Sequence, residues 1–386
     1  MHSRPYPRLA RLPRQSFFLL GVRGVGKSTW AHLCLSEAKR VDLLDEALYQ
    51  DYLVDPSLFA AELRSVSPGG WVVVDEIQRL PNLLNEVHRF IEGRRLRFAL
   101  LGSSARKLKA AGVNLLAGRA LRRMMHPLTP AELGGDFDLE AALRSGTIPL
   151  IWAAEDRRAA LESYVQLYLR EEIRAEALVR NLAGFARFLP VASLCHGATV
   201  SISGIARDCG VARTTVQGYL EILEDTLLAY RLPAFEAKLR VRERRHPKLY
   251  WVDAGLVRAT KRLYGTVAPE ERGALLEGWV FHLLRAHGEG TDLHEAIHYW
   301  SPHSAARTEV DFLLRRDGEL LAIEVKSQAR YHTGLLRGLR AVAALSGMTR
   351  RILVYGGRRS FMTEDGIDVW TFDRLHRALA EGALWP

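Results

Sequence analysis

The sequence is poor in cysteine and lacks a long apolar run. Its 386 residues include 3 cysteines, Cys34, Cys195 and Cys209, which are too scattered for a zinc site or a disulfide framework. We expect buried free thiols. No apolar stretch approaches the roughly 18 to 20 residues that span a bilayer, and the start lacks the apolar core of a signal peptide. These absences predict a cytoplasmic protein without a membrane partner.

Basic residues, by contrast, are in excess. The formal net charge is +10, and arginine is concentrated in segments such as 118–123 and 239–248. The planar donor fork of arginine suits phosphate groups, so the charge predicts nucleic acid, and DNA first, as a partner. Arginines that are merely solvated are the alternative. With 48% apolar residues the chain can build real cores, and its length predicts two or three domains.

The run SFFLLGVRGVGKSTW predicts a buried strand ending at Leu20, a glycine-rich turn and a helix from about Lys27. It matches the phosphate-loop pattern G-x-x-x-x-G-K-[ST], in which backbone N–H groups and the helix N-terminus surround phosphates. Lys27 would reach the β- and γ-phosphates of ATP, and the Ser28 hydroxyl would bind Mg²⁺. The alternative is a strand-to-helix turn without a ligand. The candidate nucleotide-binding residues of this run are Gly21, Gly24, Gly26, Lys27, Ser28 and Thr29.

An acidic pair follows the apolar run at residues 71–74. Asp75 and Glu76 stand at the C-terminal end of this predicted strand, and ligands bind at that edge of open α/β sheets. Asp75 is the candidate that organises the Mg²⁺ shell, and Glu76 is the candidate catalytic residue that polarises the attacking water. A helix cap is the alternative for the pair.

A further strand, LRFALLGSS, ends in Gly102, Ser103 and Ser104. Ser103 is our candidate for contact with the γ-phosphate or the water, against a plain turn. Arg119 is a candidate arginine finger, because catalysis of phosphoryl transfer is mainly electrostatic, and a solvated arginine is the alternative. If Arg119 served a neighbouring copy, the protein would be a homo-oligomer.

The middle of the chain reads as helical. Apolar residues at three- and four-residue spacing predict helices over residues 138–195. A short helix, a turn at Gly210 and a longer helix then follow, with LLAYRLP as the next strand. This is the layout of a helix-turn-helix with a wing. Its candidate nucleic-acid-binding residues are Arg213, Thr214, Thr215 and Gln217, although such units also serve for packing against a nucleotide-binding domain.

The stretch EVDFLLRRDGELLAIEVKS predicts a β-hairpin. Asp317 and Gly318 tolerate the positive φ that a two-residue turn needs. With that turn, Arg316 pairs with Glu319, and the register sets the strand positions on both sides.

Two carboxylates face each other in this register. Asp311 falls opposite Glu324, and Lys326 shares their face, while Ile323 and Val325 point into a core. Like charges directly opposite are destabilising, and a bound Mg²⁺ or Mn²⁺ would remove the repulsion. Lys326 would then orient water or stabilise phosphate charge. A salt-bridged hairpin without metal is the alternative.

Several motifs together carry a family resemblance. They are GVRGVGKST, VVVDEIQRLPNLLNEVHRFIE, LLGSSARKL, LLAGRA, HPLTPAELG, YLREEIRAEALVRNL and YWVDAGLVRA. The chain resembles prokaryotic AAA-type ATPases of the additional-strand (ASCE) kind that carry a C-terminal domain of unknown function, itself similar to restriction-endonuclease-like folds. The phosphate loop departs from the family at Val22, Arg23 and Gly24, where Pro-Arg-Gln is frequent.

The hairpin is similar to the D-x12-E-x-K constellation of restriction-endonuclease-like phosphodiesterases. That resemblance implies catalytic roles for Asp311, Glu324 and Lys326, metal ligation by the two carboxylates, and a further acidic ligand from an earlier helix, for which Glu277 is the match. Val310 stands where the motif has proline.

The predicted fold class is α/β, with an N-terminal P-loop ASCE/AAA-type parallel-sheet domain (1–135), a helical and winged-helix middle (136–236) and a C-terminal PD-(D/E)xK nuclease-like domain (237–386). The predicted function is ATP hydrolysis coupled to action on DNA, with metal-dependent cleavage by the C-terminal domain. The alternatives are an ATP-switched DNA-binding or regulatory protein whose nuclease-like domain does not cut, and an ATPase that remodels a protein partner.

Overall fold

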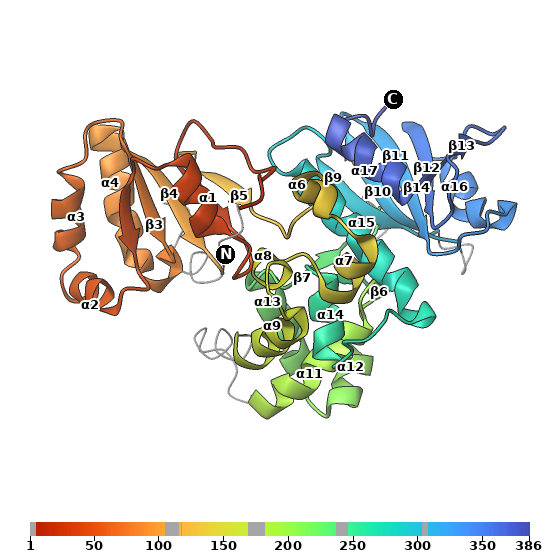
Figure 1. Cartoon of the computed structure of the whole chain (residues 1–386), viewed down its shortest axis with the longest axis horizontal. Coiled ribbons are helices and arrows are strands. Elements are labelled where there is room, and N and C mark those ends of the chain that lie inside the picture. The colour runs from red at the N-terminus through yellow and green to blue at the C-terminus, as the bar shows by residue number, and fades with distance from the viewer. Residues whose placement is uncertain (1–4, 105–115, 117, 169–181, 237–245, 303–307) are drawn as a thin grey trace.

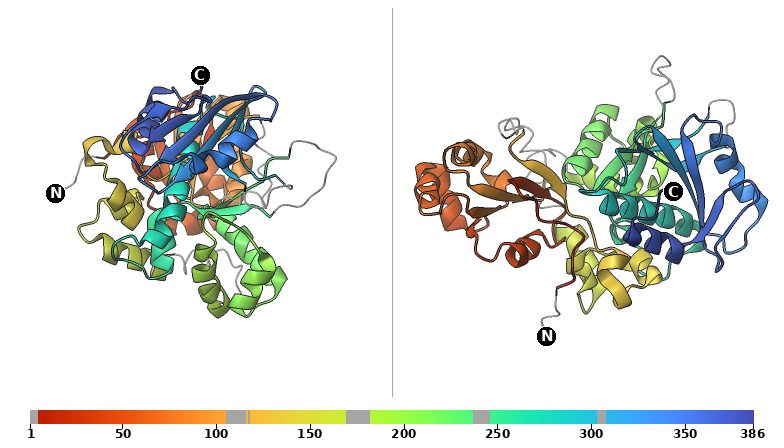
Figure 2. Two further views of the ribbon diagram at one scale, coloured as in Figure 1. Left: turned by 90° about the vertical axis from the view of Figure 1, so that its right-hand side faces the viewer. Right: turned by 90° about the horizontal axis from the view of Figure 1, so that it is seen from above.

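The computed structural model describes residues 5–104, 116, 118–168, 182–236, 246–302 and 308–386. Figure 1 shows a parallel sheet in red and orange on the left, a mixed sheet in blue on the right, and a mainly helical middle in yellow and green. Seen from above, the middle lies between the two sheets (Figure 2). Strands of the described chain form three sheets.

The N-terminal sheet is parallel throughout the described strands, in the order β2-β3-β4-β1-β5. Its strands are β1 (Phe17–Leu20), β2 (Lys39–Asp42), β3 (Trp71–Asp75), β4 (Arg97–Gly102) and β5 (Leu121–Met124). β4 separates the phosphate-loop strand β1 from the acidic-pair strand β3. That is the additional strand that the resemblance implied.

Helices bury this sheet, which explains why its central strands are almost continuously apolar. The helices are α1 (Lys27–Cys34), α2 (Glu46–Val54), α3 (Ser57–Leu63) and α4 (Leu84–Arg94). α1 and α4 both contact β4, and every residue of β1 is buried.

The middle begins with short helices that lead into a helix pair. These are α6 (Pro130–Leu133), α7 (Leu139–Ser145), α8 (Pro149–Trp152), α9 (Arg157–Ser163), the π-helical η5 (Tyr164–Tyr168), α11 (Leu182–Leu194), α12 (Ile202–Cys209) and α13 (Arg213–Asp225). Gly210, between α12 and α13, has a φ of 64°, so it adopts the left-handed conformation that ends α12. The predicted helix, turn and helix are therefore present.

A small antiparallel sheet follows α13, with order β6-β8-β7. Its strands are β6 (Ala198–Thr199), β7 (Ala229–Leu232) and β8 (Lys248–Trp251), and α14 (Ala254–Thr260) comes next. β8 lies beyond the predicted boundary at residue 236 and yet pairs with β6 and β7. This sheet therefore crosses that boundary.

The C-terminal sheet is mixed, in the order β13-β14-β12-β11-β10-β9. Its strands are β9 (Ala296–Trp300), β10 (Val310–Arg316), β11 (Glu319–Lys326), β12 (Met348–Tyr355), β13 (Phe361–Met362) and β14 (Asp368–Thr371), and its helices are α15 (Pro269–Gly288), α16 (Arg337–Val342) and α17 (Phe372–Glu381). α15 and α16 both contact β11, so the central strands are covered by helices.

The predicted hairpin register is confirmed. Arg316 pairs with Glu319, and Asp317 and Gly318 have φ values of 50° and 81°, as a type I′ turn requires. Phe312 pairs with Ile323, so the same register continued by one residue sets Asp311 opposite Glu324.

The expectation of three buried thiols was wrong for two of them. Cys209 is buried, whereas Cys195 is half-buried and Cys34 is exposed, because Cys34 ends the short helix α1 on a side that the sheet does not cover. No helix in the described ranges has the length and apolar character needed to cross a bilayer.

Candidate functional site

The phosphate loop joins β1 to α1 in a curled conformation. Gly24 and Gly26 have φ values of 75° and 92°, which side chains rarely tolerate. The Lys27 side chain is buried, and its Nζ donates hydrogen bonds to the backbone oxygens of Gly21 at 2.7 Å and Val22 at 3.3 Å. The ammonium therefore lies within the curve of the loop.

Other parts of the chain bind the carbonyl groups of the loop. The Leu150 N–H of α8 donates to the Gly24 oxygen at 3.1 Å, and the Tyr164 hydroxyl donates to the Arg23 oxygen at 3.0 Å. Arg8 Nη1 donates to the Val25 oxygen at 2.6 Å. Because phosphates bind to N–H groups rather than carbonyls, these contacts are compatible with an occupied loop and tie it to the middle of the chain.

Ser28 and Asp75 lie together at the C-terminal edge of the sheet. Burial raises the pKa of Asp75, and a hydrogen bond with the Ser28 side chain opposes that rise. A hydroxyl and a carboxylate that hydrogen-bond to each other suit a Mg²⁺ shell. Thr29, the next residue, is exposed.

Glu76 is held by a network that includes Ser103. It has a φ of 54°, an uncommon conformation for a residue with a side chain. The Ser103 hydroxyl donates to Glu76 Oε2 at 3.1 Å. Gln78 Nε2 donates to Ser103 Oγ at 3.0 Å and also to Glu76 Oε2. The structure thus brings Glu76 and Ser103 together, and it adds Gln78, which the sequence analysis missed.

Arg119 lies at an exposed position and forms an ion pair with Glu92. The expected role of Arg119 as an arginine finger stays a prediction.

The carboxylates of the hairpin are buried side by side. Asp311 is 5% and Glu324 is 6% exposed. Val325 N–H donates to Asp311 Oδ2 at 2.9 Å, and Lys326 Nζ lies 2.5 Å from Glu324 Oε1. Glu324 Oε2 has no hydrogen-bond partner within the described ranges.

Two residues of β8, which the sequence analysis missed, complete this cluster. Lys248 Nζ lies 2.9 Å from Glu277 Oε1 and 3.3 Å from Asp311 Oδ1, and it also pairs with Glu309. The Tyr250 hydroxyl donates to Glu277 Oε1. Lys248 and Tyr250 are two residues apart on one strand and so share a face, but nothing in the sequence indicates that this face meets α15.

The crowding of carboxylates shifts their protonation. Burial, and then the charge of Asp311, raise the pKa of Glu277 to about 7 and that of Glu324 to about 8. Burial alone would lower the pKa of Lys248, but Glu277, Asp311 and Glu309 hold it above its ordinary value. Burial is thus the main reason that Glu277 and Glu324 hold their protons more strongly than a solvent-exposed glutamate.

The donor atoms of the cluster fit a hard divalent cation. Glu277, Asp311 and Glu324 supply carboxylate oxygens, as Mg²⁺ or Mn²⁺ prefers. In the part of the chain that the structure describes, however, no group of three His, Cys, Asp or Glu side chains is arranged to hold a metal ion. The Lys248 ammonium lies between Glu277 and Asp311.

The predicted nucleic-acid-binding residues lie in the first turns of α13. Arg213, Thr214 and Gln217 are exposed and Thr215 is half-buried, whereas Val216 is fully buried. The polar face of this helix is therefore accessible, and its contact with DNA stays a prediction.

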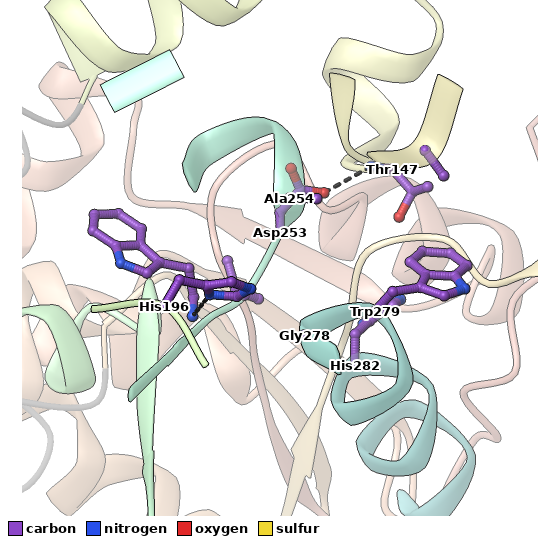
Figure 3. Close-up of a pocket in the computed structure, with 10 residues that line it drawn as sticks. Thr147, His196, Asp253, Ala254, Gly278, Trp279 and His282 are labelled. Atoms are coloured by element: carbon purple, nitrogen blue, oxygen red, sulfur yellow. Dashed lines mark hydrogen bonds between the residues drawn. The ribbon is translucent and has the colours of Figure 1, made fainter. Parts of the chain in front are cut away.

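A tight junction joins the middle to the C-terminal domain (Figure 3). Asp253, just after β8, accepts a hydrogen bond from the Thr147 N–H at 2.7 Å, and burial raises the pKa of Asp253 to about 6. A Cβ on Gly278 would lie 2.1 Å from His196 Nε2. The cavity between these residues holds about 10 Å³, too little for any ligand larger than a water. This junction serves packing rather than ligand binding.

Three family models match successive parts of the chain. Residues 13–134 match an AAA domain, residues 136–266 match a domain of unknown function (DUF8612), and residues 272–375 match another domain of unknown function (DUF4143). The N-terminal part is thus similar to AAA-type domains, in agreement with its parallel sheet and phosphate loop. A nuclease-like assignment of the C-terminal part has no support from these matches.

Relatives of the whole chain exist in mycobacteria. Uncharacterised proteins of Mycobacterium tuberculosis and Mycobacterium bovis are each 27% identical over 365 residues, which cover 92% of this chain and 80% of the relative. Among solved structures, the replication initiator DnaA bound to AMPPCP and single-stranded DNA is similar over 55% of this chain and 82% of that chain, at 16% identity and a TM-score of 0.28. A TM-score this low does not establish a common fold for the two chains.

Proposed function

We propose that this chain binds and hydrolyses ATP with Mg²⁺ and couples hydrolysis to action on nucleic acid, DNA first. The observation that carries the ATPase proposal is the convergence of the Lys27 ammonium, the Ser28–Asp75 pair and the Glu76–Ser103 pair at the C-terminal edge of an AAA-type sheet. We keep the division at residues 1–135, 136–236 and 237–386 as part of this proposal, with β8 of the last part completing the small sheet of the middle.

Each group has a separate task in this proposal. The loop N–H groups and Lys27 bind the β- and γ-phosphates, while Ser28 and Asp75 hold Mg²⁺, which neutralises charge on the transferred phosphoryl group. Glu76 orients the attacking water and accepts its proton. Ser103, which donates to Glu76 at 3.1 Å, would exchange that bond for one to the γ-phosphate.

Nucleotide binding tests the loop directly. Lys27→Ala removes a point charge from the phosphates, so ATP affinity should fall at least tenfold with or without Mg²⁺. Ser28→Ala removes a magnesium ligand, so it should weaken binding mainly when Mg²⁺ is present. Ser36→Ala, which removes an exposed hydroxyl just beyond α1, is the matched control. Equal ATP affinity in the wild type and Lys27→Ala would contradict the proposal.

For the C-terminal domain we propose a metal-dependent, nuclease-like site. Its support is the gathering of Glu277, Asp311 and Glu324 with Lys326 at the end of the β10–β11 hairpin. A metal ion there would supply a Lewis acid and an activated water. Lys326 would stabilise charge on the scissile phosphate. The alternative function is a regulatory or DNA-binding domain that keeps this cluster but does not cut.

Cleavage assays separate these two functions. Labelled single-stranded, duplex and branched DNA should be incubated with the full chain, with and without ATP and with Mg²⁺ or Mn²⁺. Cleavage that disappears in Asp311→Asn supports the nuclease. Binding of DNA without cleavage in any metal supports the regulatory alternative, and absence of DNA binding favours a protein partner.

A further inference from the structure

Lys248 approaches the carboxylate cluster from a different sheet. It begins β8, which pairs with β6 and β7, whereas Glu277 lies on α15 and Asp311 on β10. Its side chain is 4% exposed. Buried lysines require partners, and the partners here are the same carboxylates that the proposed metal site would use.

The Lys248 ammonium and a metal ion compete for the same oxygens. Nζ lies 2.9 Å from Glu277 Oε1 and 3.3 Å from Asp311 Oδ1. A Mg²⁺ ion bound to both oxygens at roughly 2.1 Å would lie at most about 5 Å from Nζ. Two cations at that distance in a buried site repel each other strongly. Because Lys248 Nζ contacts both oxygens, an ion that bridged them would have to take the place of this ammonium, whereas Lys326 contacts Glu324 Oε1 and leaves Oε2 without a hydrogen-bond partner in the described chain.

We propose that Lys248 is an internal cation that occupies the metal position of the C-terminal site, and that a divalent ion binds Glu277 and Asp311 after Lys248 withdraws. This inference rests on the proposed metal site. It explains why the described residues include three neighbouring carboxylates, two of them buried, but no arrangement that could hold a metal ion. Lys248 is thus a positioning residue: in its observed place it directs Glu277 and Asp311 toward itself.

Two neighbours indicate how the exchange would occur. Glu309 also pairs with Lys248 and is 40% exposed, so it offers the ammonium a partner closer to solvent. Glu324 Oε2 is buried and has no hydrogen-bond partner in the described chain. It is an oxygen that an incoming divalent ion would use. The lysine can thus move toward Glu309 while the ion binds Glu277 and Asp311, with Glu324 Oε2 as a further ligand.

Mn²⁺ binding to the full chain without nucleotide, measured by calorimetry and by electron paramagnetic resonance, tests the inference. Lys248→Met keeps the length of the side chain but removes its charge, so Mn²⁺ should bind at least tenfold more tightly than to the wild type. Lys39→Met is the control, because Lys39 pairs with Glu62 on the surface of the N-terminal domain. It should leave Mn²⁺ affinity unchanged.

Glu309→Gln provides a second test that does not disturb a buried group. If Glu309 holds the lysine, its neutralisation loosens Lys248 and Mn²⁺ affinity rises. If Glu309 were itself a metal ligand, the affinity would fall. If Lys248→Met does not fold, the direction of the change in Mn²⁺ affinity in Glu309→Gln still tests the role of Lys248.

The outcomes distinguish this inference from the proposed metal site. Equal Mn²⁺ affinity in the wild type and Lys248→Met, with loss of binding in Asp311→Asn, would overturn the role of Lys248 but leave the site intact. No Mn²⁺ binding to folded Lys248→Met and Glu309→Gln would overturn both. Tighter binding in both variants, abolished when Asp311→Asn is added, supports both.

Discussion

The stability of the metal-free protein should fall as the pH rises from about 7 to 8, because two carboxyls of the C-terminal cluster lose their protons in that range. The pKa values of Glu277 and Glu324 are raised to about 7 and about 8. In the unfolded chain both groups lose their protons near pH 4.5. Above that pH the folded state retains protons that the unfolded state has lost, so a rising pH favours unfolding until the folded pKa is passed.

The size of the effect follows from the same values. One retained proton changes the free energy of unfolding by about 1.4 kcal/mol per pH unit. Partial titration reduces this to about 1 kcal/mol from Glu324 between pH 7 and 8, with a few tenths from Glu277. The buried histidines change stability at lower pH. Burial lowers the pKa values of His126, His196 and His282 in the folded protein, so these side chains are largely neutral in the folded and unfolded states above pH 7.

Urea-induced unfolding of the full chain in EDTA, at several pH values across this range, measures the slope. Glu324→Gln resembles the protonated carboxyl at every pH, so its stability should depend much less on pH than that of the wild type. Glu92→Gln, at an exposed surface ion pair, should keep the wild-type slope. A wild-type stability that is flat or rises with pH, or an unchanged slope in Glu324→Gln, would refute the reasoning.

Further predictions concern DNA and the phosphate loop. DNA affinity should fall steeply as the salt concentration rises. Arg213→Ala should weaken DNA binding and reduce the slope of log affinity against log salt by about 1. DNA-binding titrations measure both effects, with Arg158→Ala, on the surface of α9, as the control. Gly24→Ala should lower ATP affinity at least tenfold, because the φ of Gly24 is 75° and the new Cβ would lie 2.8 Å from Leu150 Cβ. Wild-type ATP affinity in Gly24→Ala would show that the loop tolerates a side chain at this position. Tyr164→Phe removes the bond to the Arg23 oxygen and should destabilise the protein by about 1 kcal/mol in denaturant unfolding, and no change would mean that the bond does not anchor the loop.

Local features of the sequence predicted the elements that carry the candidate sites. The phosphate-loop pattern set the end of β1 at Leu20 and the start of α1 at Lys27, because glycine and the following hydroxyl residues define that turn locally. Asp317 and Gly318 fixed the hairpin register, which in turn placed Asp311 opposite Glu324. Such features depend on neighbours along the chain, so a single sequence contains them.

Contacts between distant segments could not be predicted in the same way. Lys248 and Asp311 are separated by 63 residues, and strand periodicity gives the face of Lys248 but not the element that this face meets. The hydrogen bonds of Leu150 and Tyr164 to the phosphate loop depend likewise on how the middle packs against the N-terminal domain. The exposure of Cys34 was mispredicted for the same reason, since burial depends on which helix face the sheet covers.

Single-turnover ATP hydrolysis tests the central claim most directly. Wild type and Glu76→Gln should be loaded with labelled ATP and Mg²⁺, freed of excess nucleotide, and followed for release of phosphate. We expect that both proteins bind ATP but that Glu76→Gln hydrolyses it at least a hundredfold more slowly, while Glu37→Gln, at an exposed position just after α1, matches the wild type. Equal rates in the wild type and Glu76→Gln, or no hydrolysis by the wild type with DNA present, would contradict this claim.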